Sequence, residues 1–567
     1  MWKQKTYDKE KESRFIEAGT HKMLARLLAQ RDFNQSVNEF LSADYQGLSH
    51  PHLLHDVEKA ARIFCDNALD KGRVAVIGDY DCDGIVSATM IKELCNIFDV
   101  ECKVFLPSRL EHGYGLNEKT IATFSERMEK VPDLLIITDC GMNSRKEVSI
   151  LRELGVGKII VIDHHTGDEG NIATNADALI TWHLSEGFNE MCACGEVFQF
   201  IRGIRWITKR VNPIEFLTYA AIGTVADVSP VVGDNRIIVK NGLSEYAINH
   251  VLGSGLNALL KQSKIHPASL TQEDIAFRIA PRINAVGRMY HPDIVHGLLI
   301  ERDVCMAEKM ADYITTYNAE RKEVQSKIEA EAKKIVNSEQ FTHGILVYGK
   351  DWHIGVVGIV AARLAELYNI PAVVVGYHNG IWKGSGRTAQ GLNLKDILDT
   401  CPELFEGYGG HAGACGVKLK DDSLNTAPER FNKACQAYMQ KHHGEKKPDK
   451  YFDAVLKPKA ITKAIGNTIL QLYPYCNEHN PEPLFKLKEV NIVDSSFIEK
   501  DTWRLLKFSV EKEGYRVPYA FKTFSPPCGS EIEGRKADII FSFPQKTKDP
   551  LNSYFAYELS VVDIELI

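Results

Sequence analysis

Runs of consecutive aliphatic residues alternate with longer amphipathic segments between residues 73 and 240. Residues 74–77, 134–137 and 159–162 are wholly aliphatic, which is typical of strands that are buried on both faces of a parallel sheet. The segments between them, such as "GIVSATMIKELCNIF" and "NSRKEVSILRELG", have helical periodicity, and the second ends on Gly155 as a helix C-cap would. This alternation predicts a doubly wound α/β domain.

The pattern changes three times after this domain. Residues 298–343 contain no Gly or Pro and are rich in Ala, Glu and Lys, which predicts one long helix. The aliphatic runs in "HGILVYG" and "PAVVVGYHNG" then flank a helical segment and predict a second, smaller α/β unit. After the charged linker "KHHGEKKPDK", short alternating runs rich in aromatics, such as "WRLLKFSV", predict a small β barrel.

A chain of 567 residues is too long for one hydrophobic core, so we expect several domains in an overall α/β fold. The predicted parts are an N-terminal arm (1–45), the doubly wound parallel-sheet domain (46–300), a long connector helix (301–340), a smaller α/β domain (341–445) and a C-terminal β-rich, OB-like module (450–567).

The composition is that of an ordinary globular protein, with 44% hydrophobic and 25% charged residues. No apolar run approaches the ~18–20 residues of a membrane span, and the polar first residues do not resemble a secretory signal. The 13 cysteines lie mostly in apolar segments, and Cys192 and Cys194 lack the spacing of a zinc site. We therefore expect reduced thiols and a cytoplasmic protein. The net charge of −7 excludes a uniformly basic surface but permits a local basic groove.

Acidic residues and two histidines follow the three buried strands. In chain order they are Asp79, Asp81, Asp83, Asp139, Asp163, His164 and His165, and Asp227 follows a later apolar segment. The carboxyl ends of parallel strands meet at one edge of a sheet, where so many carboxylates would repel one another without cations. Single members such as Asp83 or Asp139 have an alternative interpretation as helix N-caps.

The types of ligand indicate which metal this edge would bind. Many carboxylates with one or two imidazoles and no thiolate favour Mn²⁺ or Mg²⁺ over structural zinc. About six ligands are too many for one ion, so we expect a two-metal centre with ions ~3.5–4 Å apart, suited to displacement at phosphorus. The chain has no G-x-x-x-x-G-K-[ST] loop, which argues against an NTP-driven motor.

The ordered set "DYDCDG", "TDCG", "DHH" and "GTVADVSP" resembles the four motifs of the DHH phosphoesterase superfamily. Downstream, "WHIGVVGIVAARL", "GSGRT" and "GYGGHAGACG" resemble its DHH-associated domain. The segments "PSRLEHGYGLN" and "RIAPRINAVGRM", with a C-terminal β module, are similar to the branch that degrades single-stranded DNA. The resemblance extends over nearly the whole chain from about residue 45. It implies that 46–300 is the catalytic domain and 341–445 the substrate-binding domain.

The resemblance also implies roles for individual residues. The implied metal ligands are Asp79, Asp81, Asp83, Asp139, His164 and Asp227. The implied catalytic residues are Asp163, which orients the histidine pair, and His165, which lies beside the reacting phosphate. The implied DNA-binding residues are Arg109, Tyr114, Arg282, Arg288, Ser385, Arg387, Gly409, Gly410 and His411.

Two of these sites also have a physical interpretation. Gly409 and Gly410 permit close approach of the backbone to a phosphate, although "GYGGHAG" alone would equally suit a tight glycine turn. The guanidinium of Arg387, with Ser385 beside it and Arg109 from the facing domain, is suited to a terminal 5′ phosphate. The alternative for Arg387 is an interdomain salt bridge.

The function implied by the resemblance is a single-strand-specific exonuclease that uses two Mn²⁺ or Mg²⁺ ions. It would degrade DNA 5′→3′ to mononucleotides in repair and recombination. The implied partners are single-stranded DNA, with single-strand-binding protein and a helicase as candidates, and we expect a monomer that contacts no membrane.

Two alternatives remain open at this point. A phosphodiesterase for oligoribonucleotides or cyclic dinucleotides would share the metal site but would not need "APRINAVGR" or the β module. A non-catalytic DNA-binding scaffold would be expected to have lost metal ligands, whereas all of them are present here.

The C-terminal module departs from the pattern of the superfamily branch. The segment 472–485, "LYPYCNEHNPEPLF", replaces a glycine-rich "PFGxGNPxP" turn, which puts its DNA contacts in doubt. The aromatic residues of the module either stack on bases or fill a small β core.

Overall fold

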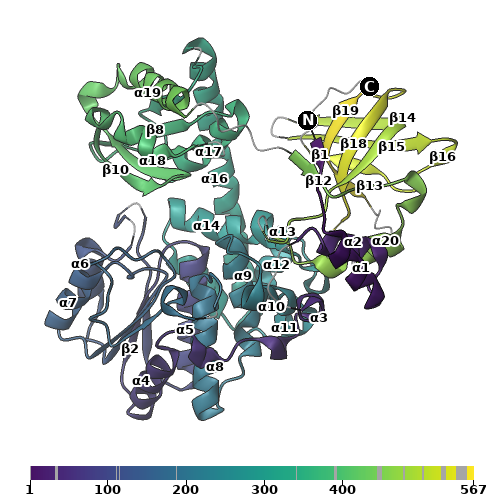
Figure 1. The fold of residues 1–567 in the computed structure, drawn as a ribbon. Helices are drawn as coiled ribbons and strands as arrows, with labels where there is room; N and C mark the ends of the chain where they lie inside the picture. Colours follow the sequence, from purple (N-terminus) through teal and green to yellow (C-terminus); the bar gives the residue numbers. More distant parts are fainter. Residues whose placement is uncertain are drawn as a thin grey trace.

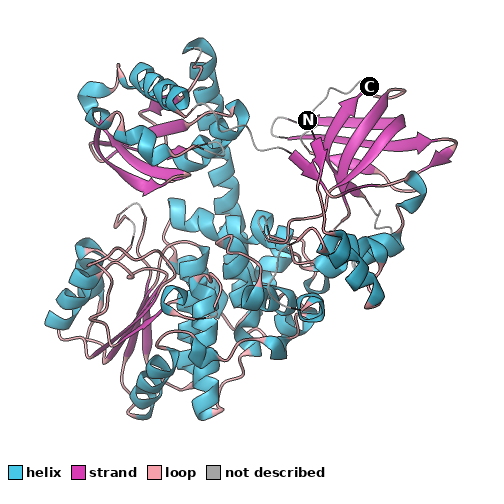
Figure 2. Cartoon of the chain, in the orientation of Figure 1, coloured by secondary structure: helices cyan, strands magenta, loops and turns pink. Residues whose placement is uncertain are grey.

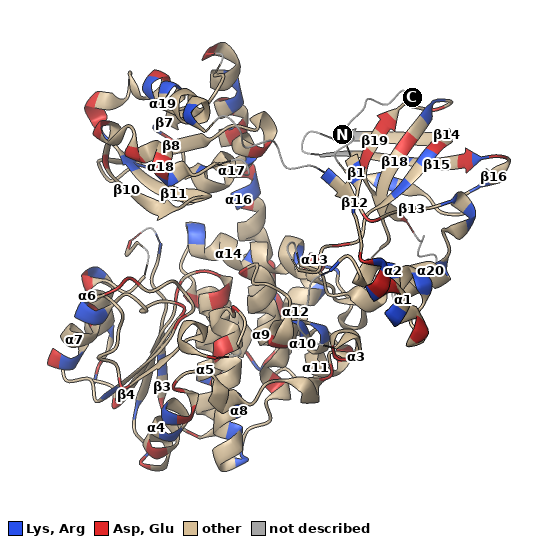
Figure 3. Ribbon diagram, in the orientation of Figure 1, with Lys and Arg blue, Asp and Glu red and all other residues tan. Residues whose placement is uncertain are grey.

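The computed structural model describes residues 2–31, 36–109, 111–113, 115–186, 188–339, 341–388, 392–442, 450–476, 479–500, 503–524, 532–544 and 558–567. Figure 1 shows the large α/β domain below the smaller α/β unit, with a barrel to one side that carries both chain termini. Acidic and basic positions are scattered over all of these parts (Figure 3). Within the described ranges, no helix combines the length and the apolar character needed to cross a membrane.

The large domain contains a five-stranded sheet in which every pair of neighbours is parallel. In spatial order its strands are β3 (Cys102–Phe105), β2 (Val74–Ile77), β4 (Leu134–Thr138), β5 (Lys158–Ile162) and β6 (Ala178–Ile180). The chain passes from β2 to β3 on one side and then to β4 on the other side of β2. The carboxyl ends of β2 and β4 therefore flank a topological switch point, the usual ligand site of such sheets.

Helices cover both faces of this sheet (Figure 2), which confirms the predicted doubly wound fold. One face, which includes Ile77 and Ile137, packs on α6 (Glu118–Arg127) and α7 (Arg145–Glu153). The helices on the opposite face are α4 (Val57–Leu69), α5 (Cys82–Ile97) and α8 (Ala193–Thr208), and α9 (Ile214–Ala226) packs on α5 and α8. Because the strands are buried on both faces, their side chains are aliphatic throughout.

A layer of shorter helices follows α9 and shares the core of α5 and α9. Its members are α10 (Gly233–Gly242), α11 (Glu245–Asn249), α12 (Gly255–Gln262), α13 (Gln272–Asp274), the π-helical turn η5 (Ile275–Ile279), α14 (Ala280–Met289) and α15 (Asp293–Ile300). Helix α14 packs between α5 and the connector helix, so this layer joins the sheet to the rest of the molecule.

The predicted connector helix is α16 (Val304–Glu339). Its 36 residues span ~54 Å at 1.5 Å per residue. It carries the smaller α/β unit, whose sheet has the order β10 (Phe405–His411), β11 (Ala414–Leu419), β9 (Ile381–Arg387), β8 (Ala372–His378) and β7 (Ile345–Gly349). The helices α17 (Val357–Tyr368), α18 (Leu394–Asp399) and α19 (Ala427–Lys441) cover this sheet.

The C-terminal module is a closed β barrel, consistent with the predicted OB-like fold, because β14 pairs with both β18 and β15. Its main strands are β14 (Phe485–Lys500), β15 (Trp503–Lys512), β17 (Phe521–Thr523), β18 (Lys536–Ser542) and β19 (Leu559–Leu566), and the shorter elements are β13 (Ala454–Val455), β16 (Tyr515–Arg516) and α20 (Lys463–Ile469). Several of its aromatics fill the core, which was one of the two interpretations of their role. The buried ones include Phe485, Phe508, Phe521, Phe541 and Phe543.

The N-terminal residues belong spatially to the barrel. The strand β1 (Trp2–Gln4) pairs in parallel with β12 (Lys450–Phe452). The helices that follow are α1 (Lys9–Glu17), α2 (Lys22–Leu28) and α3 (Val37–Ser42). Leu27 and Phe40 are buried in the same core as the barrel, so the described N-terminal residues pack against the C-terminal module although the two are far apart in the sequence.

Two buried arginines, Arg236 and Arg31, connect the N-terminal residues and the C-terminal module to each other and to the large domain. Arg236 of α10 is fully buried and donates hydrogen bonds of 2.7 to 3.4 Å to the carbonyls of residues 471–474 and of Phe40. Its guanidinium also lies 4.0 Å from the centre of the Phe40 ring. Burial lowers the pKa of Arg236 to about 10, which leaves it charged at neutral pH. In the altered segment 472–485, Asn480 bonds both to Arg31 and to the carbonyls of Leu472 and Pro474.

We expect Arg236→Met to lower the free energy of unfolding by at least ~3 kcal/mol. The substitution keeps an apolar stem but leaves several buried carbonyls without a donor, at ~1–3 kcal/mol each. Urea unfolding measures the loss, and limited proteolysis tests whether the barrel separates from the large domain. Arg62→Met, which alters an exposed i,i+4 pair with Glu58, is the control. Equal behaviour of the two variants would contradict the anchoring role of Arg236.

Candidate metal centre

The turn from β2 into α5 is held by two of the predicted ligands. Asp81 is the N-cap of α5, and its Oδ1 accepts hydrogen bonds from the backbone N–H groups of Asp83 (3.0 Å) and Gly84 (3.2 Å). Asp83 lies in the first turn of the same helix and accepts N–H bonds from Ala193 (2.8 Å) and Cys194 (2.9 Å) at the start of α8. The cap of α5 is therefore Asp81, and the N-cap interpretation of Asp83 is wrong.

Asp139 and His164 bring the ends of β4 and β5 to the same place. Asp139 has a left-handed backbone (φ 59°), an uncommon conformation outside glycine. It is not a helix cap, because Ser144 occupies that position of α7. His164 Nε2 lies 3.2 Å from Asp139 Oδ1 and 3.9 Å from Asp83 Oδ2, and its Nδ1 lies 4.0 Å from Asp227 Oδ2.

The ligand atoms form three overlapping groups, each with its atoms within 4.8 Å of one another. The groups are Asp79, Asp81 and Asp139; Asp83, His164 and Asp227; and Asp139, His164 and His165. Together they contain all six residues that the sequence predicts as metal ligands. Since Asp139 and His164 each belong to two groups, the arrangement suits two neighbouring cations with shared ligands.

The electrostatics of this cluster also favour cations. Burial, together with neighbouring carboxylates, raises the pKa of Asp79 and of Asp139 well above the ordinary value. The same causes raise the pKa of Asp227 to about 6. Asp79 Oδ1 is buried without a hydrogen-bond partner among the described residues. Oxygen-rich donors that repel one another and lack partners are suited to hard divalent ions, so these residues fit Mn²⁺ or Mg²⁺.

Asp163 and His165 form a pair beside the ligands. Asp163 Oδ1 lies 2.7 Å from His165 Nδ1, and the other carboxylate oxygen accepts a hydrogen bond from the backbone N–H of Met142 (2.7 Å). Burial alone would lower the pKa of His165, but the hydrogen bond and charge of Asp163 outweigh it and raise the pKa to about 9. This contact would let Asp163 orient the ring of His165, a role that stays a prediction.

Three supporting residues were not predicted from the sequence. His183 Nε2 lies 2.8 Å from the backbone oxygen of His164, and the ring of His183 stacks on Trp182. Ser229 donates a hydrogen bond to Asp227 Oδ2 (2.7 Å). Asn284 accepts one from the backbone N–H of Cys82 (2.7 Å). The position of His183 just after β6 was the available signal, because every strand of this sheet ends at the ligand edge.

Three of the predicted DNA-binding arginines lie together next to the metal ligands. Arg109 lies over the ring of Tyr80 (5.5 Å), the residue between Asp79 and Asp81. Burial, followed by the positive charges of Arg109 and other neighbours, lowers the pKa of Arg288 to about 10. Burial and the positive charge of Arg109 also lower the pKa of Arg387.

These arginines lack carboxylate partners. Within the described part of the chain, none of Arg109, Arg288 and Arg387 forms an ion pair, so the interdomain salt bridge considered for Arg387 is absent from that part. Arg387 donates hydrogen bonds to Ser385 Oγ and to the carbonyl of Gly386, both at 2.9 Å. A partly buried cluster of like charges is costly unless an anion joins it. The cluster is therefore suited to a phosphate.

The remaining predicted residues are placed differently. Arg282 donates to the carbonyl of Arg278 and lies near Lys322 of α16, apart from the three arginines. Gly409, Gly410 and His411 lie in strand β10, and the tight turn of the segment is at Ala412 and Gly413, between β10 and β11. His411 and Arg387 both pair with Ala414 of β11 and therefore lie on either side of it. Tyr114 lies outside the described residues.

We expect Mn²⁺ to raise the thermal midpoint of the wild-type protein far more than that of Asp139→Asn, because binding to the folded state stabilises it. Without metal, the variant should be at least as stable as the wild type at neutral pH. The environment that raises the pKa of Asp139 penalises its ionised form. The metal-free wild type should therefore gain stability relative to the variant as the pH falls through that raised value.

Thermal scans over a range of Mn²⁺ concentrations and pH values measure these effects. Asp99→Asn, which alters an exposed carboxylate (95% exposed), should respond to Mn²⁺ as the wild type does. An equal response of all three proteins would show that Asp139 is not part of a metal site.

Comparisons with known proteins agree with this geometry. Residues 73–224 match the model of the DHH family, N-terminal domain, and residues 340–441 match that of the DHHA1 domain. These matches confirm the resemblance to the DHH superfamily.

Several relatives that match most of the chain are named single-stranded-DNA-specific exonuclease RecJ. The single-stranded-DNA-specific exonuclease RecJ of Dickeya dadantii is 31% identical over 434 residues, which are 72% of this chain and 74% of the relative. RecJ of Escherichia coli is 29% identical over 82% of both chains. RecJ of Thermus thermophilus is 30% identical over 76% of this chain and 61% of the relative.

Solved structures show the same fold. The crystal structure of RecJ in complex with Mn²⁺ from Thermus thermophilus matches with a TM-score of 0.80 at 24% identity, over 100% of this chain and 79% of that one. A structure of exonuclease RecJ bound to manganese matches with a TM-score of 0.59 at 28% identity, over 68% of this chain and 95% of that one. On the sequence identity and coverage of its relatives, this chain belongs to the RecJ family.

Proposed function

We propose that this protein is a metal-dependent exonuclease that degrades single-stranded DNA from its 5′ end and releases mononucleotides, in DNA repair and recombination. The named relatives are single-stranded-DNA-specific exonucleases. One observation carries the proposal for this chain. Tyr80 stands between the ligands Asp79 and Asp81, and its ring contacts Arg109, so a phosphate-binding cluster directly adjoins the metal centre.

The proposed metal ligands are Asp79, Asp81, Asp83, Asp139, His164 and Asp227. When bound there, two Mn²⁺ or Mg²⁺ ions would activate water and neutralise charge on the phosphate under attack. The ligand carboxylates hold fixed positions, because Asp81 and Asp83 are bonded to backbone N–H groups of α5 and α8.

The proposed catalytic residues are Asp163 and His165. Asp163 holds Nδ1 of His165 at 2.7 Å, which directs Nε2 toward the substrate. A protonated His165 would donate a hydrogen bond to a non-bridging oxygen of the phosphate under attack and stabilise the developing charge.

The proposed terminal-phosphate site consists of Arg109, Arg288 and Arg387, with Ser385 beside Arg387. A terminal phosphate carries nearly two negative charges, and paired guanidinium hydrogen bonds match its oxygens. The strand cannot slide further once its end occupies this site, so cleavage at the adjoining metal centre releases one short product. Gly409, Gly410, His411 and Arg282 are proposed to contact the strand outside this site. A role for Tyr114 remains a prediction.

The setting of the reaction is also part of the proposal. The described cysteines are free, and nearly all are buried, which is usual for a cytoplasmic protein. We propose a cytoplasmic monomer that acts on strands exposed by a helicase or covered by single-strand-binding protein. In this proposal, residues 46–300 carry out catalysis, residues 341–445 bind the substrate and residues 450–567 retain the strand.

A substrate panel tests the function, and Arg387→Ala tests recognition of the end. With Mn²⁺, the wild type should degrade 5′-phosphorylated single-stranded DNA and leave double-stranded DNA and RNA largely intact. Arg387→Ala should slow cleavage of 5′-phosphorylated strands roughly tenfold to a hundredfold, because each lost charge-assisted hydrogen bond contributes ~1.5–3 kcal/mol. Its effect on 5′-hydroxyl strands should be much smaller.

Arg363→Ala, at an exposed arginine of the same domain, is the matched control and should act as the wild type does. An equal loss on both kinds of 5′ end would show that Arg387 holds the strand in general. A preference for short RNA or cyclic dinucleotides would favour the phosphodiesterase alternative, and inactivity on every substrate would favour the scaffold.

A further inference from the structure

The first turn of α8 contacts two different parts of the metal centre. The backbone N–H groups of Ala193 and Cys194 hold the carboxylate of the ligand Asp83. The side chain of Glu196, in the same turn, contacts the loop that follows β6, where its Oε1 accepts a hydrogen bond from the backbone N–H of Trp182 (2.7 Å). Glu196 is in none of the three ligand groups that the described residues form, so its presence beside the site needs a separate explanation.

Glu196 is an acid in surroundings that disfavour a charge. Its side chain is fully buried, and within the described part of the chain its Oε2 has no hydrogen-bond partner. Burial, with the charges of Asp163 and Asp83 in addition, raises the pKa of Glu196 well above the ordinary value, although the bond from Trp182 opposes this. The uncharged form is therefore favoured, and it can lie beside the ligand carboxylates without adding to their repulsion.

The bond from Glu196 fixes a pair of residues that reaches a metal ligand. Trp182 and His183 begin the short helical turn η3 (Trp182–Leu184), and their rings stack with centroids 3.9 Å apart. Nε2 of His183 lies 2.8 Å from the backbone oxygen of His164. A carbonyl oxygen only accepts, so Nε2 of His183 carries the hydrogen and donates it. These contacts connect Glu196 to the backbone of His164 in three steps.

His164 requires a well-defined position because it belongs to two of the ligand groups. Its Nε2 lies 3.2 Å from Asp139 Oδ1. Metal–ligand distances are fixed to within about 0.2 Å, so a small shift of the His164 backbone would disturb both groups. Replacing a residue that orients a ligand from behind typically changes metal affinity ~10- to 100-fold.

We propose that Glu196 is a positioning residue of the metal centre, which holds His164 in place through Trp182 and His183. The inference rests on the proposed function and adds a residue to its metal site. One turn of α8 then positions two ligands by separate means, because its backbone N–H groups hold Asp83 and the Glu196 side chain acts on His164.

Calorimetric titration of the full chain with Mn²⁺ tests the proposal. Glu196→Leu removes the acceptor for the Trp182 N–H and should raise the Mn²⁺ dissociation constant ~10- to 100-fold. Glu196→Gln keeps an oxygen at the position of Oε1 and no charge, so it should bind Mn²⁺ about as the wild type does. A loss of affinity in Glu196→Gln as large as that in Glu196→Leu would contradict a role for the acceptor oxygen.

The route through His183 is tested by a double-mutant cycle. His183→Ala should weaken Mn²⁺ binding by a factor similar to that of Glu196→Leu, and the double variant should be no weaker than either single variant. Factors that multiply in the double variant would show that the two residues act independently. Because His183 is exposed, His183→Ala should fold even if Glu196→Leu does not, and unchanged Mn²⁺ affinity in it would by itself overturn the proposal.

Gln199→Leu is the matched control for the loss of a buried polar side chain from α8. Gln199 is as buried as Glu196 and donates a hydrogen bond to Asp234 (2.7 Å), which is not a metal ligand. In urea unfolding both Leu variants should be less stable than the wild type, but Gln199→Leu should keep the wild-type Mn²⁺ affinity.

Equal Mn²⁺ affinity of the wild type and Glu196→Leu, or equal weakening by the two Leu variants, would overturn the positioning role of Glu196. Failure of the wild type to bind Mn²⁺ would overturn the metal site of the proposed function itself, which the same titration shows separately.

Discussion

The mutual repulsion of buried carboxylates at one edge of the main sheet is the constraint on which the rest of the structure depends. Parallel strands deliver Asp79, Asp139 and His164 to this edge, and burial makes the charges of the two carboxylates costly. Backbone N–H groups of α5 and α8 donate hydrogen bonds to Asp81 and Asp83, and Asp139 has a left-handed backbone. These devices hold the acids in place but do not neutralise them, which leaves a site that divalent cations complete.

Positive charges are also removed from solvent elsewhere in the molecule, in two sets of arginines. Arg236 and Arg31 are buried among carbonyl groups. The bonds of Arg236 attach Phe40 and residues 471–474 to the large domain, and those of Arg31 join the N-terminal helices to Asn480 and Pro481. Arg109, Arg288 and Arg387 are concentrated without carboxylate partners in the described chain. The first set is satisfied by the protein itself, whereas the second requires an anion. This difference distinguishes the two structural arginines from the three that we propose to bind phosphate.

Much of the catalytic part could be predicted from the sequence because its determinants are local. β2, β4 and β5 are uninterrupted aliphatic runs, and their ligands follow within a few residues. β3 and β6 carry no such signal, since β3 is only half buried and β6 has three residues, and so the supporting residue His183 was missed. The "GYGGHAG" segment suggested a turn, which lies at Ala412 and Gly413, whereas pairing with β11 places Gly410 in a strand, where a Cβ atom would lie 2.3 Å from the carbonyl of Ala414.

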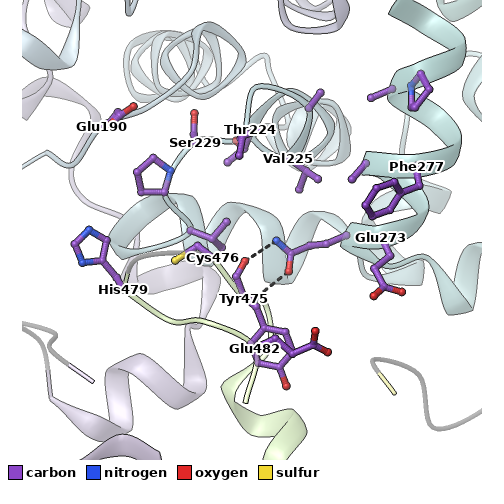
Figure 4. A pocket seen from close by; sticks show the side chains of 18 of the residues that line it. Glu190, Thr224, Val225, Ser229, Glu273, Phe277, Tyr475, Cys476, His479 and Glu482 are labelled. Atoms are coloured by element: carbon purple, nitrogen blue, oxygen red, sulfur yellow. Dashed lines mark hydrogen bonds between the residues drawn. The ribbon is translucent and has the colours of Figure 1, made fainter. Parts of the chain in front are cut away.

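Long-range packing escaped prediction for a different reason. The contact of residues 2–4 with 450–452 and the bonds from Arg236 to 471–474 join segments hundreds of residues apart. No periodicity within either segment encodes such a contact. A cavity lined by the loop after α9, by the stretch α13–η5–α14 and by the segment around residues 475–482 (Figure 4) belongs to this class, because three separate segments form it. Composition indicated only that a local nucleic-acid site was permissible, and the fold decides where it lies.

The central claim is that the acidic edge of the sheet holds two cations that share ligands. Electron paramagnetic resonance of the purified protein titrated with Mn²⁺ tests it most directly. Two ions at the ~3.5–4 Å separation typical of such centres should be magnetically coupled, so the account predicts two bound Mn²⁺ ions per chain and a coupled spectrum. A single uncoupled Mn²⁺ signal at saturation, or no tight binding, would contradict it.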